Sequence, residues 1–473
     1  MTEDRSINRR HAALLGLIVL AGALVRLRYL NLPMRYDEAF TFDTYALDGV
    51  GQITSTYDIP NNHIFYSLLA HVSWQVFGDH VWTVRLPAFI AGIALMPMAY
   101  VVARMLYDRR AGLCAAALIA TFGPLVEYSV NGRGYMLGAL LVLVALWLGG
   151  LLLRSERRLG LWIAFGAAST IAVYTVPTMA YGIAAVAMWI ALCALLDGGR
   201  VRLVVELGVA CAAAGGLSVL LYSAVLGQPG WTAVDPVPGA WSPIWQLISH
   251  TWEHWNSDAP HPVDWIVAAC FLAATVVHRR ISRYPVPLVL PVVIAIVAVI
   301  AVGKLPPFPR NWLFLLPLYL IPAGAGLSWI ASRLRPAALP DGAVTIATTG
   351  CLMVVLAAAT LNSGLRNTDT PPTSDNDIVG LLRRYVPPGQ KAVIDPVFVA
   401  VPTHYYFRRF GGSELATTHI GPAERRAGRV ILVVARNISA EEALRFFGAV
   451  PTGPARRLLH RYVNIYDVPI ARR

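Results

Sequence analysis

Residues 31–63 read NLPMRYDEAFTFDTYALDGVGQITSTYDIPNNH and directly follow the first long apolar segment of the chain. This polar stretch carries five acids and closes with two amides and a histidine: Asp37, Glu38, Asp43, Asp48, Asp58, Asn61, Asn62 and His63. Carboxylates beside a segment that can span a membrane are costly, and they usually mark a functional site. The adjacent pair Asp37 and Glu38 is therefore the first candidate for catalysis.

The composition of the whole chain is that of a polytopic membrane protein. Of its 473 residues 56% are hydrophobic and only 14% are charged, whereas a soluble domain carries about 25% charged residues. The net charge of +12 first indicates basic cytoplasmic loops, and no soluble basic face is evident that would bind nucleic acid. The five cysteines lie in apolar runs without metal-like spacing, so we expect buried thiols.

Apolar runs with the length of a membrane-spanning helix recur along residues 1–362. The first begins near His11 and lacks a small-residue cleavage site, so we expect an uncleaved helix. Further spans are predicted to begin near Trp82, Ala111, Gly134, Leu161, Pro177, Leu203, Pro262, Pro285, Asn311 and Ala343. The sequence therefore predicts a transmembrane module of about eleven helices.

Charged connectors between these spans hold most of the loop arginines, at residues 105–110, 154–158, 197–202, 278–283 and 333–335. Because Lys and Arg concentrate in cytoplasmic loops, we assign all of these connectors and the N-terminus to the cytoplasm. Alternation then requires that residues 63–77 form an amphipathic helix on the outer membrane surface instead of crossing. Surface helices are accordingly expected within the first outer loop, residues 31–81.

The same topology puts four polar segments on the outer face: residues 31–63, 129–135, 227–261 and 303–311. Arg133 and the pair Lys304 and Arg310 are cations on the side that the charge bias leaves poor in them. Arg offers a bidentate fork to phosphate and Lys a point charge, so these side chains are candidate phosphate ligands. Snorkelling towards lipid headgroups is the structural alternative.

The hydropathy changes after about residue 362, and by parity the remainder lies outside the cytoplasm. Short β-rich runs alternate with helix-like segments, at residues 378–385, 391–395, 429–434, 440–447 and 462–468. This pattern predicts a small extracytoplasmic α/β domain over residues 363–473. It contains no glycine-rich phosphate loop.

The polar candidates of the first loop also have structural explanations. Asp37 could deprotonate a hydroxyl or amine while Glu38 positions it, or the pair could cap a surface helix that begins near Glu38. His63, after Asn62, could contact a sugar, a phosphate or a metal. A lone histidine with amide neighbours is more often a hydrogen-bonding or capping residue.

Residues 250–254, HTWEH, match the H-x-x-E-H pattern of certain zinc proteases. Such an enzyme needs a third ligand, usually a carboxylate on a nearby helix. No Glu follows before Glu414, and only Asp258 and Asp264 are close. A protease is thus disfavoured, and the five tryptophans of loop 227–261 are more typical of interfacial anchoring than of sugar stacking.

The order RYDEAFTF, NNHIFYSLLAHVSWQVFG, VRLPAFIAGI and EYSVNGRGY resembles the amino-terminal half of bacterial membrane glycosyltransferases of the GT-C fold. The most similar groups are the protein O-mannosyltransferase-like family and the lipid A aminoarabinose transferases. The resemblance covers residues 10–155 and, more loosely, Arg310–Trp312 with Pro317. It hardly extends into the C-terminal domain.

This resemblance implies an inverting transferase in a bacterial inner membrane. Its donor would be a sugar on polyprenyl phosphate, and its acceptor a lipid, glycan or protein outside the cytoplasm. Asp37 matches the family's catalytic aspartate and Glu38 its acidic neighbour, while Arg133 and Tyr135 match an R-x-Y motif after the third span. His63 falls where the family has an H-P-P-like run, here replaced by Asn-Asn-His-Ile.

Such a transfer needs a base for the acceptor and a stabilised phosphate leaving group. No cofactor is demanded, and a divalent metal stays open. The expected site has catalytic Asp37 and Glu38, no assigned metal ligand, and substrate contacts from Asn62, His63, Arg133, Tyr135, Lys304 and Arg310. A transporter of lipid-linked sugars is the alternative, but it would need polar residues at the midpoints of several spans, which are apolar here.

Overall fold

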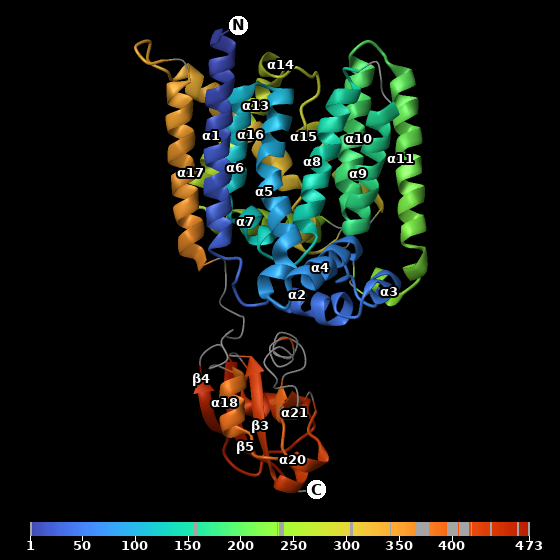
Figure 1. Cartoon of the computed structure of the whole chain (residues 1–473), viewed down its shortest axis with the longest axis vertical. Coiled ribbons are helices and arrows are strands. Elements are labelled where there is room, and N and C mark those ends of the chain that lie inside the picture. The colour runs from blue at the N-terminus through green and yellow to red at the C-terminus, as the bar shows by residue number, and fades with distance from the viewer. Residues whose placement is uncertain are drawn as a thin grey trace.

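The computed structural model contains a helical bundle and, joined to one end of it, a small sheet domain (Figure 1). It describes residues 2–155, 159–233, 235, 241–302, 306–340, 342–364, 378–394, 405, 416–417, 419–435, 438–460 and 463–471.

The bundle consists of apolar helices that, apart from the short and bent α7, run roughly parallel to one another (Figure 1). They are α1 (Thr2–Leu27), α5 (Val81–Leu106), α6 (Arg109–Thr121), α7 (Gly123–Ser129), α8 (Tyr135–Leu152), α9 (Leu159–Thr175), α10 (Met179–Leu196), α11 (Val201–Leu221), α13 (Val263–Val276), α15 (Val289–Val302), α16 (Leu315–Arg333) and α17 (Ala343–Ser363). Within the described residues, seven helices are long and apolar enough to cross a membrane, and α6 with α7 would make an eighth. A helix begins near every predicted span, but α9, α13 and α15 are shorter, so the count of eleven stays a prediction.

The bend of 63° between α6 and α7 has a clear sequence cause. Pro124 has no backbone N–H, so the Ala120 carbonyl, four residues earlier, loses its helical donor. Arg26 on α1 replaces that donor, since its Nη1 bonds to Ala120 O at 2.7 Å and its Nη2 to Ile119 O at 3.2 Å. On the other side Thr360 Oγ1 donates to Thr121 O at 3.0 Å. The break is therefore held from α1 and α17, and α7 turns across the end of the bundle.

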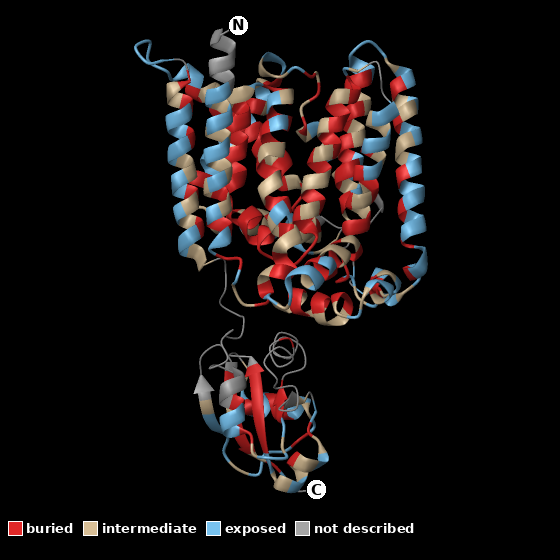
Figure 2. Ribbon diagram, in the orientation of Figure 1, coloured by how far each residue is buried: buried red, intermediate tan, exposed pale blue. Residues whose placement is uncertain are grey.

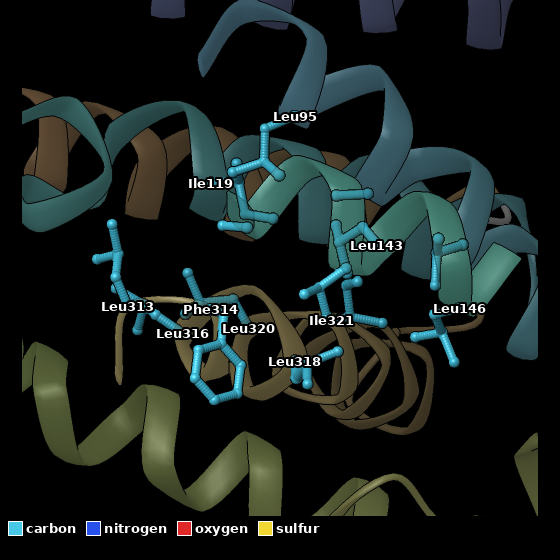
Figure 3. Packing of buried hydrophobic residues seen from close by; sticks show 14 of the residues in the cluster. Leu95, Ile119, Leu143, Leu146, Leu313, Phe314, Leu316, Leu318, Leu320 and Ile321 are labelled. Carbon is cyan, nitrogen blue, oxygen red and sulfur yellow. The ribbon is translucent and has the colours of Figure 1, made fainter. Parts of the chain in front are cut away.

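The core lies where α5, α6, α8 and α16 meet (Figure 3). It is filled by branched apolar side chains such as Leu95, Ile119, Leu143, Leu146, Leu320 and Ile321. The outer helices α1, α11 and α17 instead expose much of their apolar surface (Figure 2). This distribution is expected where lipid surrounds the bundle.

Short helices cover one end of the bundle, beside α7 (Figure 1). They are α2 (Tyr36–Thr41), η1 (Phe42–Ala46), α3 (Val50–Ser55) and α4 (Ile64–Phe77). The fold class predicted from the sequence is thus confirmed, including surface helices in the first loop. The basic connector that contains α14 (His278–Ile281) lies at the opposite end, as does the N-terminus (Figure 1). Which end faces the outside of the cell stays a prediction.

The C-terminal domain is the expected α/β unit. Its described elements are α18 (Ile378–Tyr385), β1 (Ala392–Ile394), β2 (Ala416–Thr417), α20 (Pro422–Ala427), β3 (Arg429–Ala435), α21 (Ala440–Phe446), β4 (Arg456–His460) and β5 (Val463–Pro469). The strand order is β2-β1-β3-β5-β4, with β1 parallel to β2 and β3, and β5 antiparallel to β3 and β4. Tyr405, which lies between β1 and β2 in the sequence, is buried. Its ring packs edge-on against that of Phe42 in η1, with ring centroids 5.8 Å apart.

Candidate active site

Asp37 lies in the first turn of α2, at the end of the bundle that the short helices cover. Its side chain is 31% exposed, and Oδ2 lies 3.6 Å from Nη2 of Arg310. Arg310 belongs to η4 (Pro309–Trp312), directly before α16, and its side chain is also 31% exposed. The fold thus brings a predicted acid and a predicted cation together at the surface, from opposite halves of the chain.

Glu38 has a different environment from its neighbour, because it is fully buried. Arg85 of α5 donates from Nε to Oε1 and from Nη2 to Oε2, each at 2.7 Å. The backbone N–H groups of Arg35 and Gly132 donate to the same carboxylate. Burial alone would raise the pKa of Glu38, but the charges of Arg85 and Arg35 and the hydrogen bonds that both donate together outweigh it, and the pKa is lowered. Glu38 is therefore an ionised anchor, and the helix turn that it fixes directs Asp37 outward.

Arg85 was not among the residues singled out from the sequence. Besides Glu38, its guanidinium bonds to the carbonyls of Leu30, Leu32 and Pro33 at 2.6–3.0 Å. It therefore ties the end of the first span to α2. The sequence did contain a signal for this role, because Arg85 lies near the start of the span predicted to begin near Trp82. A charged side chain at such a position usually has a buried partner.

Arg133 is buried, with 2% of its surface exposed. Its Nη1 donates to Thr41 Oγ1 and to Asn61 O, both at 2.7 Å, and its Nη2 lies 3.1 Å from His63 Nε2. The side chain thus joins α2 to the segment before α4. The prediction that Arg133 contacts a phosphate remains untested, and this burial favours a structural role.

His63 precedes α4 and is buried against the turn that leads into α8. Its Nδ1 accepts the Gly134 N–H at 2.9 Å, and its Nε2 lies 3.1 Å from Arg133 Nη2. Burial lowers the pKa of His63 well below its usual value, and the charges of Arg133 and Arg310 lower it further. The ring is therefore neutral. A Cβ added at Gly134 would lie 2.6 Å from Thr175 Cγ2 and 3.2 Å from His63 Nδ1, which explains a glycine there.

Tyr135 connects this turn to Arg310. Its hydroxyl accepts from Arg310 Nε at 3.3 Å and donates to Asn311 Oδ1 at 3.3 Å. The Arg310 guanidinium also stacks 4.2 Å from the centroid of the Phe308 ring. Burial alone would lower the pKa of Arg310, but Tyr135 and Asp37 raise it on balance. Arg310 is a charged, oriented and partly open cation.

Asn62 and Lys304 are the two remaining residues that were predicted to contact substrate. Asn62 is fully buried, and its amide donates to Ile53 O and Thr56 O, both at 2.8 Å. Ser67 Oγ donates to its carbonyl oxygen at 2.9 Å, so Asn62 joins α3 to α4. Lys304 lies outside the described residues.

Arg35 and Glu127 form a further ion pair at this end that the sequence analysis did not identify. Arg35 Nη1 lies 2.6 Å from Oε1 of Glu127, which is on α7. Both residues stand inside quoted motifs, RYDEAFTF and EYSVNGRGY. Spacing gave no hint of their contact, because 92 positions separate them.

The zinc-protease pattern lies on α12 (Trp241–Asn256). His250 is exposed there, while the ring of His254 lies edge-on to Tyr128 with centroids 6.3 Å apart. Across the described residues, no group of three or more His, Cys, Asp or Glu side chains could hold a metal ion. HTWEH remains a sequence match without a third ligand in that part of the chain.

Comparisons with known proteins identify the fold that carries this site. The family model of dolichyl-phosphate-mannose-protein mannosyltransferases matches residues 61–225. The apo crystal structure of ArnT from Cupriavidus metallidurans superposes with a TM-score of 0.61 at 13% identity, covering 96% of this chain and 98% of that one. The same protein bound to undecaprenyl phosphate gives 0.57 at 14% identity, covering 95% and 97%.

The oligosaccharyltransferase AglB from Archaeoglobus fulgidus, in complex with an inhibitory peptide and a dolichol-phosphate, gives a TM-score of 0.55 at 13% identity. That match covers 92% of this chain and 71% of AglB. The curated proteins give no sequence match. The resemblance found in the first 155 residues is therefore confirmed at the level of the fold, and the chain has the GT-C glycosyltransferase fold.

Proposed function

We propose that this protein is a membrane glycosyltransferase that moves a sugar from a polyprenyl-phosphate-linked donor to a lipid, glycan or protein acceptor. The reaction takes place at the bundle end covered by α2 to α4, on the extracytoplasmic face of a bacterial inner membrane. Asp37 is the base, and the anomeric carbon is inverted.

The observation that carries the proposal is the pair of Asp37 and Arg310. They combine a partly exposed carboxylate with a partly exposed guanidinium, 3.6 Å apart, at one end of the bundle. Inverting transfer needs these two groups, a proton acceptor near the incoming nucleophile and a fixed positive charge near the departing phosphate. Glu38 and Arg133 are both buried and bonded to protein partners, so they hold the surrounding segments in place and leave Asp37 and Arg310 as the open pair.

The reaction follows as a single displacement. The acceptor hydroxyl or amine attacks the anomeric carbon, and Asp37 takes the proton that it loses. The bond between that carbon and the phosphate oxygen breaks, and its electron pair stays on the polyprenyl phosphate. Arg310 stabilises this charge, and protonation of Asp37 frees Arg310 from its own counter-ion as the charge develops.

The related structures support the class of donor. ArnT is described bound to undecaprenyl phosphate and AglB to a dolichol-phosphate, and both share the fold over most of this chain. A lipid carrier would also suit the location of Asp37, at the boundary between apolar helices and polar surface loops.

The decisive measurement is transfer by the purified protein in liposomes, with radiolabelled polyprenyl-phosphate sugars and crude envelope acceptors. Asp37→Asn should abolish transfer while folded protein is recovered normally, because the side chain lies outside the packed core. Asp48→Asn is the matched control, since Asp48 is an exposed acid of the same loop, and it should keep wild-type transfer.

Equal transfer by wild type and Asp37→Asn would show that Asp37 is structural and the proposed base wrong. If no donor were consumed but the lipid-linked sugar changed leaflet, the protein would be a transporter instead.

A further inference from the structure

Arg35 immediately precedes α2 and lies two residues before Asp37. Its backbone N–H is used to fix Glu38, at 2.9 Å from Oε2. Its side chain extends separately to Glu127 and remains 21% exposed. Arg35 is therefore a second partly exposed arginine, two residues from the proposed base.

Only one carboxylate oxygen of Glu127 binds the Arg35 guanidinium. Oε1 is 2.6 Å from Arg35 Nη1, whereas no described residue donates a hydrogen bond to the buried Oε2. The position of α7, which carries Glu127, is set by the break that Arg26 and Thr360 hold. The Arg35 side chain is consequently held against a rigid element.

Arg35 and Arg310 approach the same part of the site. Glu127, which binds Arg35, is the residue next to Tyr128 in α7. The Tyr128 ring packs edge-on against that of Tyr135, with centroids 5.6 Å apart, and Tyr135 bonds to Arg310. Two guanidinium groups thus lie around one aromatic pair, near Asp37.

We propose that Arg35, oriented by Glu127, is a second phosphate-binding cation, and that it holds the polyprenyl phosphate together with Arg310. This inference rests on the proposed function. The donor is a phosphodiester with one negative charge, while the departing phosphate monoester carries about 1.5 to 2 at neutral pH. A second arginine therefore interacts more strongly with the phosphate as the bond breaks and charge builds on it than with the intact donor, and this difference lowers the barrier.

The test compares the binding of undecaprenyl phosphate and of uncharged undecaprenol to the purified full-length protein in detergent. Arg35→Gln alone would leave Glu127 buried without its partner and could destabilise the fold. The informative variant is Arg35→Gln with Glu127→Gln, which removes both charges and keeps an amide at each position. Arg28→Gln is the control, since Arg28 is an exposed arginine and lies, like Arg35, in the segment between α1 and α2.

The double variant should bind undecaprenyl phosphate about tenfold or more weakly than wild type, because a charge-assisted contact is lost. It should bind undecaprenol as wild type does and unfold at a similar temperature. Arg28→Gln should match wild type for both lipids. A role limited to the ion pair with Glu127 would not produce this selective loss for the charged lipid.

Undecaprenyl phosphate affinity within twofold of wild type in the double variant would overturn the proposal. If Arg310→Gln weakened phosphate binding in the same experiment, the proposed function would stand without Arg35. No preference of wild type for the phosphate over the alcohol would overturn both. Should the double variant fail to fold, Arg35→Met with Glu127→Met removes both charges with apolar side chains that tolerate burial, and undiminished phosphate affinity there would overturn the proposal.

Discussion

Arg85 and Glu38 meet through two parallel hydrogen bonds of 2.7 Å, and neither side chain reaches solvent. This buried pair joins α5 to α2 at the residue next to Asp37. It separates the two adjacent acids into distinct roles, with Glu38 fixing the helix turn and Asp37 left open. The predictions below begin from this pair.

Replacing Arg85 by Met should destabilise the protein severely, by about 3–5 kcal/mol, because Glu38 would remain buried without its cation. The measurement is the unfolding temperature of the purified protein in detergent. Arg85→Met combined with Glu38→Gln should recover part of the loss, since no uncompensated charge remains. A single variant as stable as wild type would contradict the assigned role of the pair.

Replacing Arg310 by Gln should lower kcat for transfer by about 10²–10³ with little change in stability, because a donor aimed at developing charge is lost. Arg310→Lys should retain an intermediate rate, since the charge remains without the fork. Steady-state kinetics on a polyprenyl-phosphate sugar distinguishes these outcomes. An unchanged kcat in Arg310→Gln would exclude Arg310 from the leaving-group role.

His63 should make the stability of the folded protein depend on pH. Its pKa is lower in the folded protein than in the unfolded chain, so below about pH 6.5 the unfolded chain binds more protons. Stability should therefore fall as the pH drops from 6.5 towards the folded pKa. Unfolding temperatures at pH 7.5 and 5.5 should differ less in His63→Asn than in wild type. His80→Asn, which changes an exposed histidine of the same loop, should behave as wild type.

Gly134→Ala should destabilise the turn before α8 by about 1–3 kcal/mol, since overpacking forces neighbours to move. The added Cβ would meet Thr175 Cγ2 at 2.6 Å and His63 Nδ1 at 3.2 Å. Gly166→Ala in α9 is the matched control, because nothing lies within 4 Å of its added Cβ. A melting curve for each variant measures the difference, and equal stability of the two would refute this account of Gly134.

Much of the architecture could be predicted from the sequence, because apolar length and charge bias act locally. The polar segments around Asp37, Tyr135 and Arg310 were expected at one end of the bundle, and hydrogen bonds and ion pairs now join them. The surface position of α4 followed from the distribution of basic connectors alone. The number of helices that cross the membrane is harder to predict from the sequence, because α13 and α15 are short.

The partners of the individual arginines could not be predicted in this way. Arg133 stands in an outer turn as an apparent ligand for phosphate, yet its donors face Thr41 and Asn61. Arg26 bonds to carbonyls whose need for a donor arises only from the break at Pro124. Each outcome depends on which backbone groups tertiary packing leaves unsatisfied, and residue spacing does not encode that.

The burial of Tyr405 has a consequence for the attachment of the C-terminal domain. The domain follows α17 in the chain, and Tyr405 also packs against Phe42 of η1. A protease cut introduced between α17 and α18 would leave this aromatic pair as a remaining contact between the domain and the bundle. The fraction that co-purifies with the helical bundle after such a cut, in wild type and in Tyr405→Ala, would measure how firmly one aromatic side chain retains an entire domain.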